Sequence, residues 1–167
     1  MITLEKTETI EGIELLLLGF EEEVERKREL SDIEKEIELK DYEKELLNPN
    51  LSFFVIKNDQ TPVGIVSYTI RENGNKKYYA DFSRFYIAAE HRKKGIRKSA
   101  EDELKLSFKK DGIRYMKQAV ESTNKDYITI LKKNGHMWKE RYYSEKERRE
   151  WLVYIKIIQN GRNRKSK

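Results

Sequence analysis

The sequence contains no cysteine and only two prolines and eight glycines among its 167 residues. Without cysteine, the chain has no disulfide bond, no cysteine-ligated metal site and no cysteine nucleophile, and we expect a reducing, cytoplasmic setting. The scarcity of proline and glycine excludes linker-like or collagen-like segments and favours long elements with few breaks. No apolar run approaches the roughly 18 residues of a membrane span, so we expect no membrane association.

What the sequence has in abundance is charge, at 39% of residues, alongside ten Tyr, six Phe and two Trp. These aromatic residues supply large core side chains that disordered chains lack. We therefore expect a single globular domain over residues 1–158. Residues 159–167 form a basic polar tail, for which solvation or a contact with nucleic acid or a partner are both possible.

The charge is unevenly distributed along the chain. Residues 21–45 hold twelve acidic and six basic side chains, whereas residues 76–117 hold thirteen basic and six acidic ones. Nucleic-acid binding requires a continuous basic face, so the acidic segment argues against it. The two histidines, His91 and His136, are isolated, and no cluster of acidic ligands accompanies them, so we expect no metal site.

The spacing of apolar residues predicts a mixed α/β (α+β) fold, with Thr7 or Thr9 capping the first helix and Ser31 or Asp32 the second. The predicted order is β-α-α-β-β-β-α-β-α-β-β. The elements are a strand at 2–4, helices reaching Val24 and Leu47, strands at 51–56, 63–70 and 78–87, a helix at 96–109, a strand at 113–120, a helix at 124–133, and strands at 137–143 and 151–158.

The stretch from Ile87 to Lys98 joins a predicted strand to a predicted helix and carries five Lys or Arg residues without an acid after residue 90. The N–H groups of a helix start, together with the helix dipole, form an anion site. Gly95 permits an anion to approach the backbone closely. The glycine spacings of the P-loop and of the Rossmann fold are absent. On this stretch alone, an anion site and a solvated basic surface both remain open.

The segment Arg92-Lys93-Lys94-Gly95-Ile96-Arg97 resembles the Gln/Arg-x-x-Gly-x-Gly/Ala signature of the GNAT N-acetyltransferase family, except at its last position. The predicted element order over residues 1–158 is similar to the family fold. Downstream, Asn124 opens a helix that ends at Asn134-Gly135, which is also similar to the family pattern.

This resemblance implies a GNAT-like mixed, largely antiparallel sheet that splays between its fourth and fifth strands and is flanked by about four helices, with acetyl-CoA in the opening. Its cofactor-binding residues would belong to three groups. They are the signature loop (Arg92, Lys93, Lys94, Gly95, Ile96, Arg97 and Lys98) for the pyrophosphate, the strand backbone at Phe85, Tyr86 and Ile87 for the pantetheine, and Asn124 for the cofactor arm.

Two positions depart from the family pattern. Arg97 stands where Gly or Ala is usual, and its side chain either turns outward to add a phosphate contact or crowds the loop. Leu131 stands where a tyrosine often serves as general acid. Tyr127 lies one helical turn earlier on the same face and is a candidate substitute. Tyr142 and Tyr143 are further candidates, and each of these tyrosines can equally be an ordinary packing residue.

For a catalytic base, the predicted fourth strand offers Asp81, which can equally be structural. The resemblance implies an acetyl-CoA-dependent N-acetyltransferase in which a primary amine attacks the thioester directly. The acidic segment at residues 21–45 favours a cationic small molecule or peptide amine as acceptor. The alternative is a CoA-binding regulatory module without activity. A homodimer is possible, because dimers are common in the family.

Overall fold

The computed structural model describes residues 1–158, and the predicted tail at residues 159–167 lies outside them. The order of elements is the one that the sequence predicts. The elements are β1 (Ile2–Lys6), α1 (Glu14–Phe20), a π-helical turn (Glu21–Glu25), α2 (Asp32–Glu45), β2 (Leu51–Asn58), β3 (Thr61–Glu72), β4 (Tyr78–Ile87), a 3₁₀ turn (Ala89–His91), α3 (Ile96–Lys110), β5 (Ile113–Glu121), α4 (Lys125–Lys133), β6 (Met137–Ser144) and β7 (Arg149–Ile157).

The strands are hydrogen-bonded in the order β1-β2-β3-β4-β5-β7-β6. The pairs β1–β2, β2–β3, β5–β7 and β6–β7 are antiparallel. Strands β4 and β5 are parallel, with pairs running from Tyr78–Ile113 to Phe82–Gln118. The predicted fold class, a mixed and largely antiparallel sheet with four α-helices among the described residues, is confirmed.

The chain forms two compact units. Strands β3 and β4 and helix α3 each pass from one unit to the other. The first unit comprises residues 1–69 and 84–103, and the second comprises, among the described residues, 70–83 and 104–158. The single domain expected over residues 1–158 stays a prediction.

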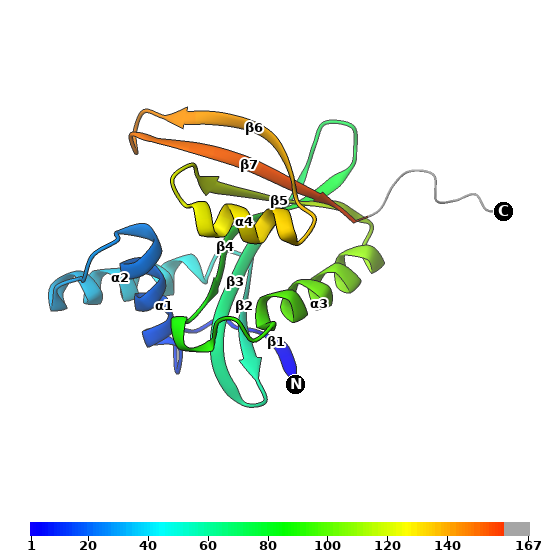
Figure 1. Ribbon diagram of the computed structural model, residues 1–167. Helices are drawn as coiled ribbons and strands as arrows, with labels where there is room; N and C mark the ends of the chain where they lie inside the picture. The colour runs from blue at the N-terminus through cyan, green and yellow to red at the C-terminus, as the bar shows by residue number, and fades with distance from the viewer. Residues whose placement is uncertain (159–167) are drawn as a thin grey trace. The chain divides into compact units, whose positions relative to one another are not determined.

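In the first unit, α1 and α2 pack on one face of β2, β3 and the end of β4 (Figure 1). Apolar side chains from all of these elements make one buried cluster. Its members are Ile13, Leu17, Phe20, Tyr42, Leu46, Phe53, Val55, Ile65, Tyr86 and Ala88. Burial of this cluster therefore fixes the end of β4 against the two N-terminal helices.

The first helix begins at Glu14, so the prediction that Thr7 or Thr9 caps it is wrong. The two threonines instead bond each other: Thr7 Oγ1 donates to the Thr9 carbonyl at 2.8 Å and accepts from Thr9 N at 3.3 Å. Such a local side-chain turn satisfies the backbone groups that a helix would use.

The second helix is capped by Ser31, as predicted. Ser31 Oγ accepts from Glu34 N at 3.2 Å, and the Glu34 carboxylate accepts from Ser31 N at 2.9 Å. These reciprocal bonds form a capping box. The hydrogen bond from Arg28, followed by the backbone bond from Ser31, lowers the pKa of Glu34 to about 2.

The second unit contains the start of β4 together with β5, β6 and β7, and α4 packs on it. Its smaller apolar cluster consists of Val120, Ile128, Leu131 and Tyr154. Within residues 1–158, none of the helices is long and apolar enough to cross a membrane.

Candidate functional site

The end of β4 and the loop that follows it build the first part of the site. Phe85, Tyr86 and Ile87 are all buried, whereas Lys93, Lys94 and Gly95 of the loop are exposed. The sequence changes here from apolar residues to lysines, so the chain leaves the core and reaches solvent within a few residues.

The loop backbone contains two exposed residues in the left-handed conformation. Lys93 and Gly95 both have left-handed φ angles, of 63° and 75°. A Cβ added at Gly95 would meet nothing within 4 Å, so the space above this backbone is open. Helix α3 follows at Ile96, and its first turn contains no acid. The free N–H groups of a helix start favour an anion, and left-handed residues in a preceding turn are typical of backbone anion sites.

Arg92 ties this loop to β4 and to the π-helical turn. Its Nε donates to the Ile87 carbonyl at 2.8 Å, and its Nη2 lies 2.7 Å from Glu23 Oε2. The guanidinium also lies 5.5 Å from the centroid of the Tyr86 ring. The first residue of the signature therefore has a structural role in holding the loop.

Arg97 lies over β4 and does not turn outward. Its Nη1 donates to the Phe85 carbonyl at 3.1 Å, and its Cζ lies 3.9 Å from the centroid of the Phe85 ring. Lys98, the next cation, pairs with Asp102 one turn along α3 at 3.1 Å. The loop therefore presents its backbone and the two exposed lysines outward, while Arg97 covers the strand.

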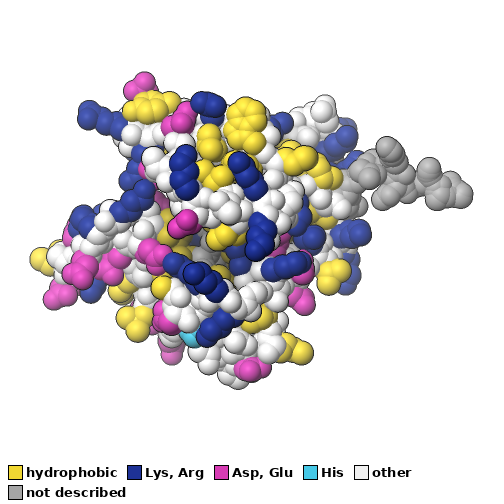
Figure 2. Space-filling model, viewed as in Figure 1, with side chains coloured by type: hydrophobic (Ala, Val, Ile, Leu, Met, Phe, Trp, Pro, Cys, Tyr) yellow, Lys and Arg dark blue, Asp and Glu magenta, His cyan; other side chains and the backbone are white. Residues whose placement is uncertain are grey.

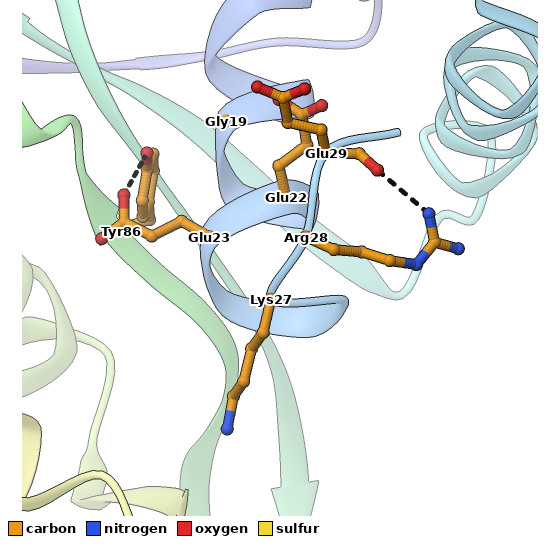
Figure 3. A pocket seen from close by; sticks show the side chains of 7 residues that line it. All are labelled: Gly19, Glu22, Glu23, Lys27, Arg28, Glu29 and Tyr86. Carbon is orange, nitrogen blue, oxygen red and sulfur yellow. Dashed lines mark hydrogen bonds between the residues drawn. The ribbon is translucent and has the colours of Figure 1, made fainter. Parts of the chain in front are cut away.

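A pocket of about 530 Å³ adjoins the same end of β4. It adjoins the π-helical turn and Tyr86, and Glu23 of the turn faces Tyr86 (Figure 3). The lining residues are Gly19, Glu22, Glu23, Lys27, Arg28, Glu29 and Tyr86. Because π-helical turns recur at functional sites, this turn marks the pocket as a place to expect a ligand.

The pocket lining carries three glutamates and two basic side chains, and Glu23 is the glutamate beside Tyr86. Figure 3 shows Lys27 and Arg28 extending away from Glu23 and Tyr86. Arg28 uses its Nη2 to pair with Glu34 of α2 at 2.7 Å. Acidic side chains also gather at the left of Figure 2, where Figure 1 places α1 and α2.

Tyr86 connects the pocket to β4. Its hydroxyl donates to Glu23 Oε1 at 3.1 Å. Burial, and then the neighbouring Glu23 carboxylate, raises the pKa of Tyr86 to about 12, so the hydroxyl stays protonated near neutral pH. Glu23 thus accepts from Tyr86 with one oxygen and from Arg92 with the other.

In the second unit, Asn124 caps α4. Its Oδ1 accepts from Tyr127 N at 3.2 Å, so a bond from Asn124 to a cofactor would come from its Nδ2. The Tyr127 hydroxyl donates to Gln118 Oε1. Leu131 has an exposed fraction of 0% in the apolar cluster, so a tyrosine there would overpack the core. Gln118 was not among the residues predicted from the sequence, and nothing in its spacing indicates its role.

Asp81 also lies in the second unit, on β4. Its Oδ2 is 2.8 Å from Arg71 Nε, and its side chain is 29% exposed. It is therefore accessible and already paired with a guanidinium, and its role as base stays a prediction.

The loop suits the pyrophosphate of a CoA molecule, whereas the end of β4 is already hydrogen-bonded where the pantetheine would pair with it. The loop offers open backbone above Gly95 and exposed lysines, which suit a pyrophosphate. The strand carbonyls of Phe85 and Ile87 already accept bonds from Arg97 and Arg92.

The sequence profile of the Acetyltransferase (GNAT) family matches residues 16–136. This match spans the end of β4, the loop and the N-terminal turn of α3. No curated protein sequence matches the chain.

Solved structures with the same fold are numerous. An acetyltransferase from Salmonella typhimurium, which modifies the N-terminal serine of ribosomal protein L7/L12, aligns with a TM-score of 0.75, at 15% identity, over 95% of each chain. The PaiA N-acetyltransferase from Thermoplasma acidophilum in complex with coenzyme A aligns at 0.71, with 20% identity, over 94% of this chain and 99% of that one. A spermidine/spermine N-acetyltransferase from Vibrio cholerae aligns at 0.65, with 16% identity, over 94% and 92%.

Proposed function

The chain belongs to the acetyltransferase (GNAT) family, and from this membership we propose that it is an acetyl-CoA-dependent N-acetyltransferase acting on a primary amine. The single observation that carries the proposal is the family match, which includes the whole loop from Arg92 to Lys98. The relative from Thermoplasma acidophilum, whose structure contains coenzyme A, supports the choice of cofactor.

Acetyl-CoA supplies an acetyl group activated as a thioester. In the proposal, the amides from Lys93 to Lys98 and the exposed loop lysines hold the pyrophosphate, while the backbone from Phe85 to Ile87 receives the pantetheine. Asn124 adds a bond to the cofactor arm through its Nδ2. The protein's main contribution is then alignment of the amine, with a strand N–H that polarises the carbonyl.

We assign the acceptor to the pocket beside Tyr86. Three glutamates and two basic side chains line it, and Glu23 is the charged side chain that lies against Tyr86. Such a lining attracts a cationic amine, and the attraction weakens as salt screens it. The relative from Vibrio cholerae acts on spermidine and spermine, which are polycationic amines.

For proton transfer, the proposal uses Asp81 as base. Tyr127 serves as general acid in place of the tyrosine that the family often has at the position of Leu131. An amine must lose a proton as it attacks, so a carboxylate that accepts it directly or through water fits the reaction. The bond from Tyr127 to Gln118 fixes the hydroxyl of the only tyrosine in α4.

The test combines CoA titration by calorimetry with a thiol-release assay on acetyl-CoA. The acceptors are a polyamine, an aminoglycoside, a lysine-containing peptide and a peptide with a free N-terminus. We expect CoA to bind, and at least one cationic amine to be acetylated with a kcat/KM that falls as salt rises. Failure of the protein to bind CoA overturns the proposal.

A second candidate is a CoA-binding regulatory module without acetyltransferase activity. Arg97 over Phe85 and Leu131 in the apolar core favour it, because each departs from the catalytic pattern of the family. Binding of CoA without turnover on any acceptor would select this alternative.

A further inference from the structure

The feature that the proposed function leaves unexplained is the position of Arg97. Its guanidinium contacts Phe85 of β4 twice, through the ring at 3.9 Å and through the carbonyl at 3.1 Å. A cation stacked on an aromatic ring while donating to a carbonyl has two favourable partners. A glycine or alanine at this position, as the family signature has, could make neither contact.

The Phe85 carbonyl, which accepts the bond from Arg97, points to the edge of β4 that faces away from β3. A Cβ at Gly64 of β3 would overlap the Tyr86 carbonyl, so that carbonyl points toward β3. Carbonyls alternate along a strand, so those of Phe85 and Ile87 point to the opposite edge. Arg97 and Arg92 donate to these two carbonyls. The edge to which an extended ligand would add is therefore covered by two arginines of the loop.

The two arginines are held differently. Arg92 is tied to Glu23 by an ion pair of 2.7 Å, which keeps it beside Ile87. Arg97 is rooted in the first turn of α3, two residues after Gly95, where the left-handed backbone and open space favour an anion.

We propose that Arg97 makes binding along β4 conditional on phosphate, so that the site selects phosphate-bearing pantetheine thioesters and rejects phosphate-free ones. This inference rests on the proposed function, which assigns phosphates to the loop and pantetheine to β4. A phosphate accepts the guanidinium in charge-assisted, bidentate bonds, and these bonds compensate for the departure of the guanidinium from Phe85. A ligand without phosphate has to displace Arg97 with no such compensation.

The experiment measures the dissociation constants of CoA, 4′-phosphopantetheine and pantetheine by calorimetry on the full chain. The variants are Arg97→Ala, Arg97→Lys and, as the control, Lys110→Ala. Lys110→Ala removes an exposed cation from the last turn of the same helix without uncovering Phe85. Thermal unfolding of each variant checks that it is folded. If Arg97→Ala does not fold, Arg97→Lys still tests the proposal, because lysine keeps the charge but lacks the planar group that stacks on Phe85.

We expect Arg97→Ala to bind pantetheine about tenfold more tightly than the wild type, while CoA binds equally or less tightly. The preference for CoA over pantetheine then shrinks at least tenfold, Arg97→Lys lies between the wild type and Arg97→Ala, and Lys110→Ala leaves the binding of pantetheine unchanged. Unchanged or weaker pantetheine binding in folded Arg97 variants that still bind CoA overturns this inference alone. Absence of CoA binding in the wild type overturns the proposed function, and this inference with it.

Discussion

Gly95→Ala provides a direct test of the loop, because the chain contains a matched control at Gly112. Gly95 has φ = 75° and Gly112, in the turn after α3, has φ = 77°. A Cβ at either glycine would meet no atom within 4 Å. The two substitutions therefore impose the same backbone strain and no steric overlap within the protein.

The left-handed conformation costs an L-residue about 1–2 kcal/mol. We expect both variants to lose this amount of unfolding free energy in urea titrations. Only Gly95→Ala places a methyl group where the proposed pyrophosphate approaches the backbone. We expect it to weaken CoA binding by about tenfold, equivalent to ~1.4 kcal/mol, and Gly112→Ala to leave the dissociation constant unchanged.

Calorimetric titration of CoA into both variants and the wild type, at a temperature where all three are folded, makes the comparison. If Gly95→Ala and Gly112→Ala bind CoA equally well, the loop is not the pyrophosphate site. If the two lose different amounts of stability, the assumption of equal strain is wrong.

Three other predictions concern buried or paired groups. Burial, only partly offset by the hydrogen bond from Tyr42, raises the pKa of Glu21 above its ordinary 4.5, so the stability that this group contributes is present below that pH and is lost as the pH rises through the folded-state pKa. The stability of Glu21→Gln relative to the wild type should therefore increase as the pH rises above 4.5, and a pH-independent difference would contradict this. Gly64→Ala brings a Cβ onto the Tyr86 carbonyl and should lower the unfolding free energy by about 1–3 kcal/mol, measured in urea; an unchanged midpoint would show that β3 and β4 separate freely. Asp81→Asn should lower kcat by about 10²–10⁴-fold with unchanged CoA affinity, whereas full activity with an unaltered pH profile would remove Asp81 from the mechanism.

The order of elements was predictable because apolar spacing changes from helical to alternating where the backbone changes, as at Asn48-Pro49-Asn50 before β2. The capping of α2 by Ser31 was predictable for a similar reason, since a capping box depends on residues three apart. The loop from Arg92 to Lys98 was identified from its glycine and its cations, which are local features as well.

Side-chain direction was not predictable, because it depends on partners distant in the sequence. Nothing near Arg97 indicates whether it turns outward or onto Phe85, twelve residues earlier. The π-helical turn beside the pocket reads in the sequence as a continuous acidic helix. Likewise, the contact between Tyr86 and Glu23 joins residues 63 positions apart, so only the fold reveals it.

The carboxylate of Glu23 has a consequence for attempts to change the acceptor preference of this protein. One of its oxygens accepts a hydrogen bond from Tyr86 beside the pocket, and the other pairs with Arg92, which holds the loop. A replacement at Glu23 that is chosen for a new amine alters the loop at the same time, so its effects on the two ligands are not additive. Redesign of the proposed acceptor pocket should therefore begin at Glu29 and leave Glu23 in place, because a change at Glu23 alters its contacts with Tyr86 and with Arg92 together.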